Sequence, residues 1–237
     1  MDETAPTDAP SLAGRGPGLR SVASLLVLGT ALLATPFPGV GEETCIACRA
    51  DRSAVLAPYD EATREALRGG AIRTAWVEPD ADGRGVRAAM IVDAPPERVW
   101  SVLTAWERWP DFVPRLQELE VRSASEPVRL RHRVQVVGMD VRYGTVRTLE
   151  PAAGRIEARL DPQQENDLET NRTVWQLVPL DDGARTFVEV QARLRTGWTL
   201  PGFVEEMLLD ETLPDQMRAF RRAIVPPEQK GDEAAGG

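Results

Sequence analysis

The sequence predicts an α+β domain in which a curved antiparallel sheet of about six to seven strands wraps around a long carboxy-terminal helix, with two short helices after the first strand. Two observations support this fold class. From residue 116 onward, consecutive segments alternate apolar and polar side chains with period two, and only short turns separate them, which is typical of an antiparallel meander. The segments at 95–104 and 201–224, which flank this run, have the 3.6-residue period of a helix instead.

Local signals place the helices that precede the meander. A helix at 58–67 carries an apolar face and ends at a glycine pair, which favours termination. The helix at 95–104 opens with two prolines, which are tolerated in a first helical turn. Residues 109–114 again hold prolines, so only a turn or a very short helix fits there.

The folded domain is expected to occupy residues 72–225. A segment at 42–71, with the first helix, precedes it, and a disordered polar tail at 226–237 follows. The long final helix at 201–224 is expected to kink at Pro214. The expected strands are 72–78, 86–92, 116–121, 128–137, 139–149, 155–160, 173–180 and 186–194.

The amino-terminal part of the chain predicts targeting rather than folding. Residues 1–20 are rich in Pro, Gly and Ala and are expected to be a disordered leader. Residues 21–41 carry no charge, and their apolar part has the length of a signal-peptide core. Counted as a helix, they also just cross a hydrocarbon core of about 30 Å, so they are either a cleaved signal peptide or a retained membrane anchor. The protein is therefore expected to be exported, in the periplasm or another extracytoplasmic compartment.

Cys45 and Cys48 form a lone Cys-x-x-Cys pair directly after this segment. Such a pair serves as a disulfide, a reactive dithiol or half of a zinc site, and the second half of a zinc site is absent from the sequence. In an oxidising compartment, a disulfide between Cys45 and Cys48 is the leading interpretation, and redox activity is the alternative.

Composition excludes several classes of function. The 237-residue chain has 28 basic and 37 acidic side chains and a formal net charge of −9, which argues against a nucleic-acid partner. Its single histidine, His132, excludes metal sites built on two or three histidines, and no Walker-type phosphate loop occurs. We therefore expect no metal and no cofactor.

One face of the strand at 128–137 is apolar apart from His132. The even positions share this face, whereas the odd positions carry arginines and are expected to be solvated, so His132 points to the interior. A histidine on an apolar face is more often a packing residue than a catalyst. If the interior holds a ligand, however, His132 is the polar group best placed to meet the head of that ligand.

The following strands add further candidates to the same face. Tyr143 and Arg147 alternate with outward positions. Burying the Arg147 charge without a partner costs on the order of several kcal/mol, so Arg147 is expected to reach a carboxylate or an anionic ligand, or to lie at the mouth of a cavity. Trp175, Val190 and Met207 extend the predicted lining. For each of these residues, ordinary core packing is the alternative interpretation.

Trp106, Trp109 and Phe112 cluster near the hinge between the two short helices. One interpretation is a hydrophobic gate or an edge that touches a membrane, because tryptophan favours such interfaces. The alternative is a packing contact that pins the short helices to the sheet.

Two motifs resemble a known superfamily. The stretch 91–100, IVDAPPERVW, resembles the strand and Ala-Pro-x-x-x-Val-Trp opening of START-like helix-grip proteins, the SRPBCC superfamily. The stretch 109–114, WPDFVP, resembles the Tyr-Pro-x-Phe-x-Pro segment of its coenzyme Q-binding and polyketide cyclase/dehydrase-like branch, with Trp in place of the usual Tyr. The resemblance covers residues 72–224. It implies the helix-grip fold, but it transfers no catalytic residues, because the superfamily includes both lipid carriers and ring cyclases.

These expectations lead to two main hypotheses of function. The leading one is a secreted or membrane-tethered domain that binds or transfers a hydrophobic small molecule, a lipid or a quinone, with His132 and Tyr143 orienting its head group. The alternative is a cyclase/dehydrase-type enzyme for a polyketide-like or aromatic substrate, in which His132 is a general base and Tyr143 or Arg147 stabilises an enolate. The expected export argues against the enzyme hypothesis, because polyketide-type intermediates are made in the cytoplasm. A third, weaker hypothesis is a protein-interaction module with a filled core.

Overall fold

A computed structural model describes residues 45–136, 138–196 and 212–226, all of which belong to one compact unit of the chain. The expected leader at 1–20, the expected signal or anchor at 21–41, Met207 and nearly all of the expected tail at 226–237 lie outside the described residues. No helix in the described ranges has the length and apolarity needed to cross a membrane.

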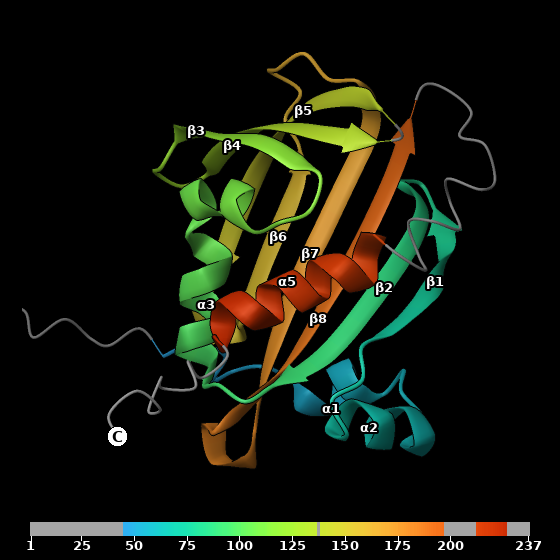
Figure 1. Cartoon of the computed structure of the whole chain (residues 1–237), viewed down its shortest axis with the longest axis vertical. Helices are drawn as coiled ribbons and strands as arrows, with labels where there is room; N and C mark the ends of the chain where they lie inside the picture. Colours follow the sequence, from blue (N-terminus) through green and yellow to red (C-terminus); the bar gives the residue numbers. More distant parts are fainter. Residues whose placement is uncertain (1–44, 137, 197–211, 227–237) are drawn as a thin grey trace, which may run out of the picture. The chain divides into compact units, whose positions relative to one another are not determined.

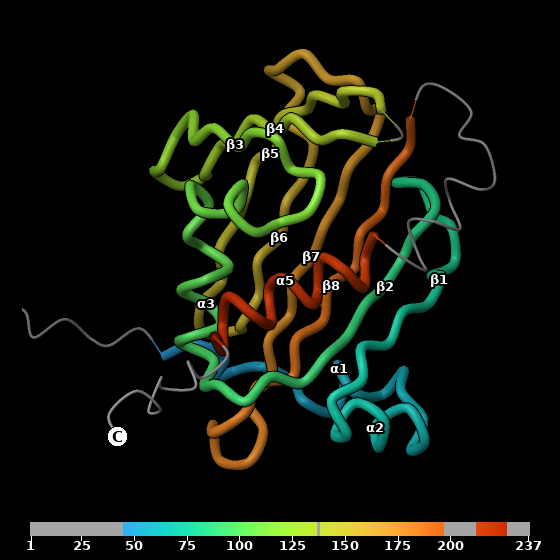
Figure 2. The backbone as a smooth tube through the Cα atoms, viewed as in Figure 1, coloured from blue at the N-terminus to red at the C-terminus, as the bar shows by residue number. Residues whose placement is uncertain are grey.

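The described chain forms one antiparallel sheet of eight strands in the order β1-β2-β8-β7-β6-β5-β4-β3. Strands β3 to β8 form the predicted meander, and β2 pairs with β8, so that β1 and β3 lie at opposite edges (Figure 2). The α+β class is confirmed, and the sheet has one strand more than the upper expected number because both strands of the first hairpin join it. The strands are β1 (Arg73–Asp80), β2 (Gly83–Val92), β3 (Leu116–Ser123), β4 (Val128–Val136), β5 (Met139–Glu150), β6 (Arg155–Leu160), β7 (Leu168–Leu180) and β8 (Arg185–Thr196).

Alternation along the strands gives the sheet an inner and an outer apolar face. In β2, Ala88 and Met90 belong to the main core, whereas Ala89 and Ile91 belong to a second cluster on the opposite face. Helix α5 crosses the inner face, and helices α1 and α2 lie near one end of β1 and β2 (Figure 1). The α-helices are α1 (Arg52–Leu56), α2 (Glu61–Arg68), α3 (Pro96–Thr104) and α5 (Leu213–Ile224), and the short 3-10 helices are η1 (Trp106–Asp111), η2 (Pro151–Ala153) and η3 (Asp181–Gly183).

Helix α5 buries the apolar side that its sequence predicts. Met217, Phe220 and Ile224 belong to the main core. Arg98 of α3 donates hydrogen bonds to the carbonyl oxygens of Ile224 and Ala223, at 3.1 and 3.2 Å, and thereby satisfies the end of the helix. Residues 201–211 of the expected helix lie outside the described residues, so the kink at Pro214 stays a prediction. In the described part, Pro214 lies in the first turn of α5, where a proline is tolerated.

The segment before the sheet holds two helices where one was expected at 58–67. The Asp60 carboxylate accepts a hydrogen bond of 2.7 Å from the Thr63 amide, so α2 begins at Glu61 and a separate turn, α1, precedes it. Tyr59 and Leu67 belong to the apolar cluster on the outer face of the sheet. Through these two residues the segment packs against the sheet.

Cys45 and Cys48 are free thiols in the structure, and the disulfide between them stays a prediction. Both cysteines are exposed, whereas Ile46 and Ala47 between them are buried. The Cys48 thiol points toward the Cys45 carbonyl oxygen, with Sγ and O 3.8 Å apart. A hydrogen bond to Cys48 raises the pKa of the Cys45 thiol, so the structure does not activate this cysteine as a thiolate.

Candidate ligand-binding site

The inner face of the sheet borders a cavity of about 270 Å³. This volume lies just below the range of about 300–1,000 Å³ typical of small-molecule sites. Its walls come from strands β2 to β8, from η1 and the loop after it, and from the first turn of α5. The lining includes these residues predicted from the sequence: Trp109, His132, Tyr143, Arg147, Trp175 and Val190.

Short side chains create the space, and they lie in one row across the sheet. Strand pairing places Arg147 beside Ala158, Ala158 beside Thr173, Thr173 beside Ala192, and Ala192 beside Val86. All five side chains line the cavity. The row thus begins with a large cationic side chain and continues over small ones, which leaves room for a ligand next to the guanidinium group.

His132 and Tyr143 form a stacked pair on the wall. They are cross-strand partners, with ring centroids 4.7 Å apart and an angle of 6° between the ring planes. Nε2 of His132 and Oγ1 of Thr145 are 2.9 Å apart, a hydrogen bond that orients the imidazole. Burial, together with the positive charge of Arg147, holds the pKa of His132 well below its usual value, so the ring is neutral at pH 7. Burial likewise raises the pKa of Tyr143, so its phenol stays protonated.

Arg147 is buried, with 4% of its surface exposed. Its guanidinium carbon lies 4.8 Å from the ring centroid of Trp109 and 5.6 Å from that of Trp106, which are cation–π distances. Among the described residues it forms no ion pair with a carboxylate, and its Nε has no hydrogen-bond partner. Burial lowers the pKa of Arg147 to about 10, so the side chain remains a cation at neutral pH.

The aromatic residues predicted as a gate pack inside the protein. Trp106 and Trp109 are buried, and Nε1 of Trp109 donates a hydrogen bond of 3.2 Å to the Val102 carbonyl oxygen. The rings of Trp109 and Phe112 meet Phe220 of α5 edge-on, at 5.0 and 5.3 Å. These contacts match the alternative interpretation, a packing contact that pins the short helices. Neither indole forms an exposed edge, as contact with a membrane would require, and gating stays a prediction.

Three polar groups of the wall were not predicted from the sequence. Thr145 lies between Tyr143 and Arg147 on the same face of β5, and Asn171 and Thr173 precede Trp175 on the same face of β7. The period-two rule that selected the aromatic and charged residues also selects Thr145 and Thr173, whereas Asn171 precedes the strand expected at 173–180.

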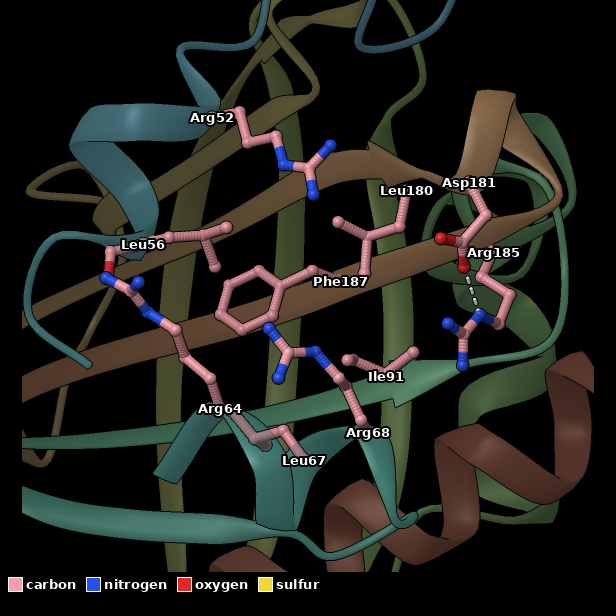
Figure 3. Close-up of a pocket in the computed structure, with 10 residues that line it drawn as sticks. All are labelled: Arg52, Leu56, Arg64, Leu67, Arg68, Ile91, Leu180, Asp181, Arg185 and Phe187. Atoms are coloured by element: carbon pink, nitrogen blue, oxygen red, sulfur yellow. Dashed lines mark hydrogen bonds and ion pairs between the residues drawn. The ribbon is translucent and has the colours of Figure 1, made fainter. Parts of the chain in front are cut away.

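A second hollow, of about 70 Å³, lies on the outer face of the sheet near α1 and α2. Figure 3 shows arginines around an apolar floor that includes Phe187. Arg185 pairs with Asp181, and Arg64 donates a hydrogen bond of 3.0 Å to the Leu56 carbonyl oxygen. Because the hollow is small and these cations already have partners, the inner cavity is the stronger candidate. The described ranges contain no cluster of three or more His, Cys, Asp or Glu side chains that could hold a metal ion.

Comparison with known proteins identifies one family. The family described as polyketide cyclase / dehydrase and lipid transport matches residues 92–221. No curated protein matches the chain.

Similar solved structures share the fold. They include a START superfamily protein from Mycobacterium smegmatis, with 22% identity and a TM-score of 0.51 over 59% of this chain and 96% of that one. A STAR-related lipid transfer protein fragment from Xanthomonas axonopodis has 18% identity and a TM-score of 0.51, covering 65% of this chain and 93% of that one. Human StAR-related lipid transfer protein 5 has 13% identity and a TM-score of 0.51, covering 73% of this chain and 97% of that one. These likenesses support the START-like helix-grip fold.

Proposed function

Because the chain belongs to the polyketide cyclase/dehydrase and lipid transport family, we propose that it binds or transfers a hydrophobic small molecule, a lipid or a quinone, in the cavity on the inner face of its sheet. The observation that carries the proposal is the cavity of about 270 Å³, with its mostly apolar wall and a few polar groups on β4, β5 and β7. An apolar concave site with few convergent polar groups is the usual form of a small-molecule site. The lipid-transfer names of the similar structures from Xanthomonas axonopodis and human agree with this choice.

Burial of the ligand supplies the affinity. Enclosing about 300 Å² of apolar ligand surface contributes about 7.5 kcal/mol at about 25 cal/mol per Å². This is close to the value of about 8.2 kcal/mol for a micromolar dissociation constant, before the entropy cost of association is subtracted. Polar contacts then serve selectivity more than affinity.

His132 and Tyr143 would orient the head of the ligand. Their stacked rings stand side by side on the wall, and Thr145 fixes the imidazole through the 2.9 Å contact to Nε2. Both rings are neutral at pH 7, so they offer hydrogen bonds rather than charge. If His132→Ala and Tyr143→Phe leave both affinity and head-group preference unchanged, this assignment is wrong.

The proposed place of action is outside the cytoplasm. The uncharged segment at 21–41 supports export, followed by either cleavage or retention as an anchor. Fractionation of cells that express the full chain tests this. Recovery in the cytoplasm as an uncleaved soluble protein would contradict it.

Catalysis of the cyclase/dehydrase type is the second candidate, because a phenol and a cationic guanidinium border the same cavity and together suit the stabilisation of an enolate. That mechanism also needs a general base, and His132 is poorly suited to this role. A general base works best with a pKa near the working pH, and the pKa of His132 is held well below its usual value. Binding is therefore the function that the site supports better.

The test is native mass spectrometry of the full chain, expressed with export, followed by organic extraction of whatever co-purifies. We expect a bound apolar molecule of defined mass. Ala192→Leu, which places bulk in the row of small side chains, should abolish the adduct, whereas Ala184→Leu, at an exposed position after η3, should retain it. A wild-type protein that stays empty and also rejects fatty acids and quinones would overturn the proposal in favour of catalysis or protein interaction.

A further inference from the structure

We infer that the ligand of this cavity is an amphipathic anion, an apolar molecule with one carboxylate, and that Arg147 binds the carboxylate. The inference rests on the proposed function and adds the charge of the ligand to it. It comes from the one buried charge on the inner wall, which among the described residues has no counter-charge.

The other buried charges of the described chain already have partners. Asp161 pairs with Arg129 at 2.6 Å and accepts a hydrogen bond of 2.9 Å from Gln164. Glu189, on the outer face, accepts a hydrogen bond from Tyr59. Among partly buried arginines, Arg172 pairs with Glu157 at 2.9 Å, whereas Arg221 keeps Nε and Nη2 without a hydrogen-bond partner. Of the three buried charged side chains in the described ranges, Arg147 is thus the one that has neither an ion-pair partner nor a hydrogen-bonded hydroxyl.

Contacts within the protein compensate the Arg147 charge only in part. The indoles of Trp106 and Trp109 offer cation–π contacts, each worth about 2 kcal/mol when desolvated. Removing the guanidinium from water costs several kcal/mol in effective terms, about as much as or more than these contacts return. His132 and Tyr143 on the same wall are neutral at pH 7 and supply no negative charge. The other charged residue of the lining, Arg115, is a further cation.

The position of Arg147 fits a ligand head group. The residue lies at one end of the row of short side chains, next to Ala158 and then Thr173. A carboxylate has the planar, two-oxygen shape that matches the fork of a guanidinium group, which favours paired hydrogen bonds. The apolar body of the ligand would then lie over Ala158 and Ala192, against Trp175.

The experiment compares matched ligands on delipidated full-length protein at pH 7.5. Dodecanoic acid, its methyl ester and dodecanol share a similar chain and differ in charge, and their affinities are measured by native mass spectrometry and by competition with a fluorescent fatty acid. We expect the acid to bind at least about 30-fold more tightly than the ester or the alcohol, the low end of what a buried charge pair contributes.

Variants assign the effect to Arg147. Arg147→Met keeps the apolar stem and should lose the preference for the acid while it retains binding of the ester. Arg147→Lys should restore part of the preference. Arg142→Met, an exposed position on the same strand, is the matched control and should behave as the wild type. Circular dichroism verifies that each variant folds.

The outcomes separate this inference from the proposed function. Equal binding of acid, ester and alcohol by the wild-type protein would overturn the inference and leave the binding function in place. No binding of any of the three, nor of a quinone, would overturn the proposed function itself. The wild-type comparison decides the charge preference even if Arg147→Met fails to fold.

Discussion

Phe220 holds helix α5 against the sheet, and its removal tests the packing that shapes the cavity. The side chain is fully buried. Its ring meets three others edge-on, Trp109 and Trp175 at centroid distances of 5.0 Å and Phe112 at 5.3 Å. These rings come from η1, from the turn after it and from β7. The Phe220 side chain therefore packs α5 against both the η1 region and the sheet.

Phe220→Ala should lower the free energy of unfolding by about 4–5 kcal/mol. A buried Phe→Ala change costs about 3–5 kcal/mol, and the loss of aromatic pairs worth about 0.5–1.5 kcal/mol each places this site at the upper end. Phe220→Leu keeps apolar bulk but loses the ring contacts, so it should cost about 2 kcal/mol. Val225→Ala, at an exposed position just after the helix, is the control and should change stability by less than about 0.5 kcal/mol.

Urea unfolding followed by tryptophan fluorescence and far-ultraviolet circular dichroism measures these changes. With a slope of about 2 kcal/mol per molar urea, the alanine variant should shift the midpoint by about 2 M. A loss below about 1 kcal/mol with an unchanged slope would refute the reasoning, because it would mean that α5 does not pack on the sheet through this ring.

Three further predictions concern polar groups. Burial alone would raise the pKa of the Asp161 carboxyl, but hydrogen bonds from neighbouring side chains outweigh this effect and lower the pKa. Asp161→Asn should therefore lower the free energy of unfolding by about 1–2 kcal/mol at pH 7. The variant should also show a smaller fall in melting temperature than the wild type as the pH drops through the folded pKa of Asp161. Tyr59→Phe removes the donor to buried Glu189 and should cost about 1–3 kcal/mol in thermal unfolding, whereas a neutral result would contradict that hydrogen bond. Because folding lowers the pKa of His132, this side chain becomes protonated at a higher pH in the unfolded chain than in the folded protein. The free energy of unfolding should therefore fall as the pH drops below about 6.5. The imidazole signal of this only histidine, followed by NMR in the folded protein, should not titrate near pH 6.5, and a midpoint there would contradict the burial.

Most of the fold could be predicted because alternation survives wherever one face of a strand is buried. The strand expected at 155–160 is β6 with the same bounds, and the faces of β4 and β5 are as expected. Strand β7 begins earlier than predicted, at Leu168. Its first residues hide the pattern, because Glu169 and Arg172 form ion pairs with Arg195 and Glu157 rather than contributing to an apolar face.

The sequence predicts which side chains of the candidate site point to the inner face of the sheet. It does not predict which side chains of other strands lie next to them. Period two placed His132, Tyr143 and Arg147 on the inner side of the sheet, and the structure has them there. Two properties of the site depend on more than one strand. The lack of a carboxylate beside Arg147 among the described residues depends on what the other strands bring near it, and the pattern of β5 alone does not contain that information.

The cavity itself depends on register, because its volume comes from short side chains that lie side by side. Ala158, Thr173 and Ala192 come from three strands and are adjacent only in the pairing that the structure shows. A shift of one residue in either pairing would turn side chains from one face to the other and close the row. The same register sets Arg147 at the end of that row, beside Ala158. The pairing of β5 to β8 therefore creates both the space for an apolar ligand body and the position of the cation for its head group. A change that alters this pairing should remove both together.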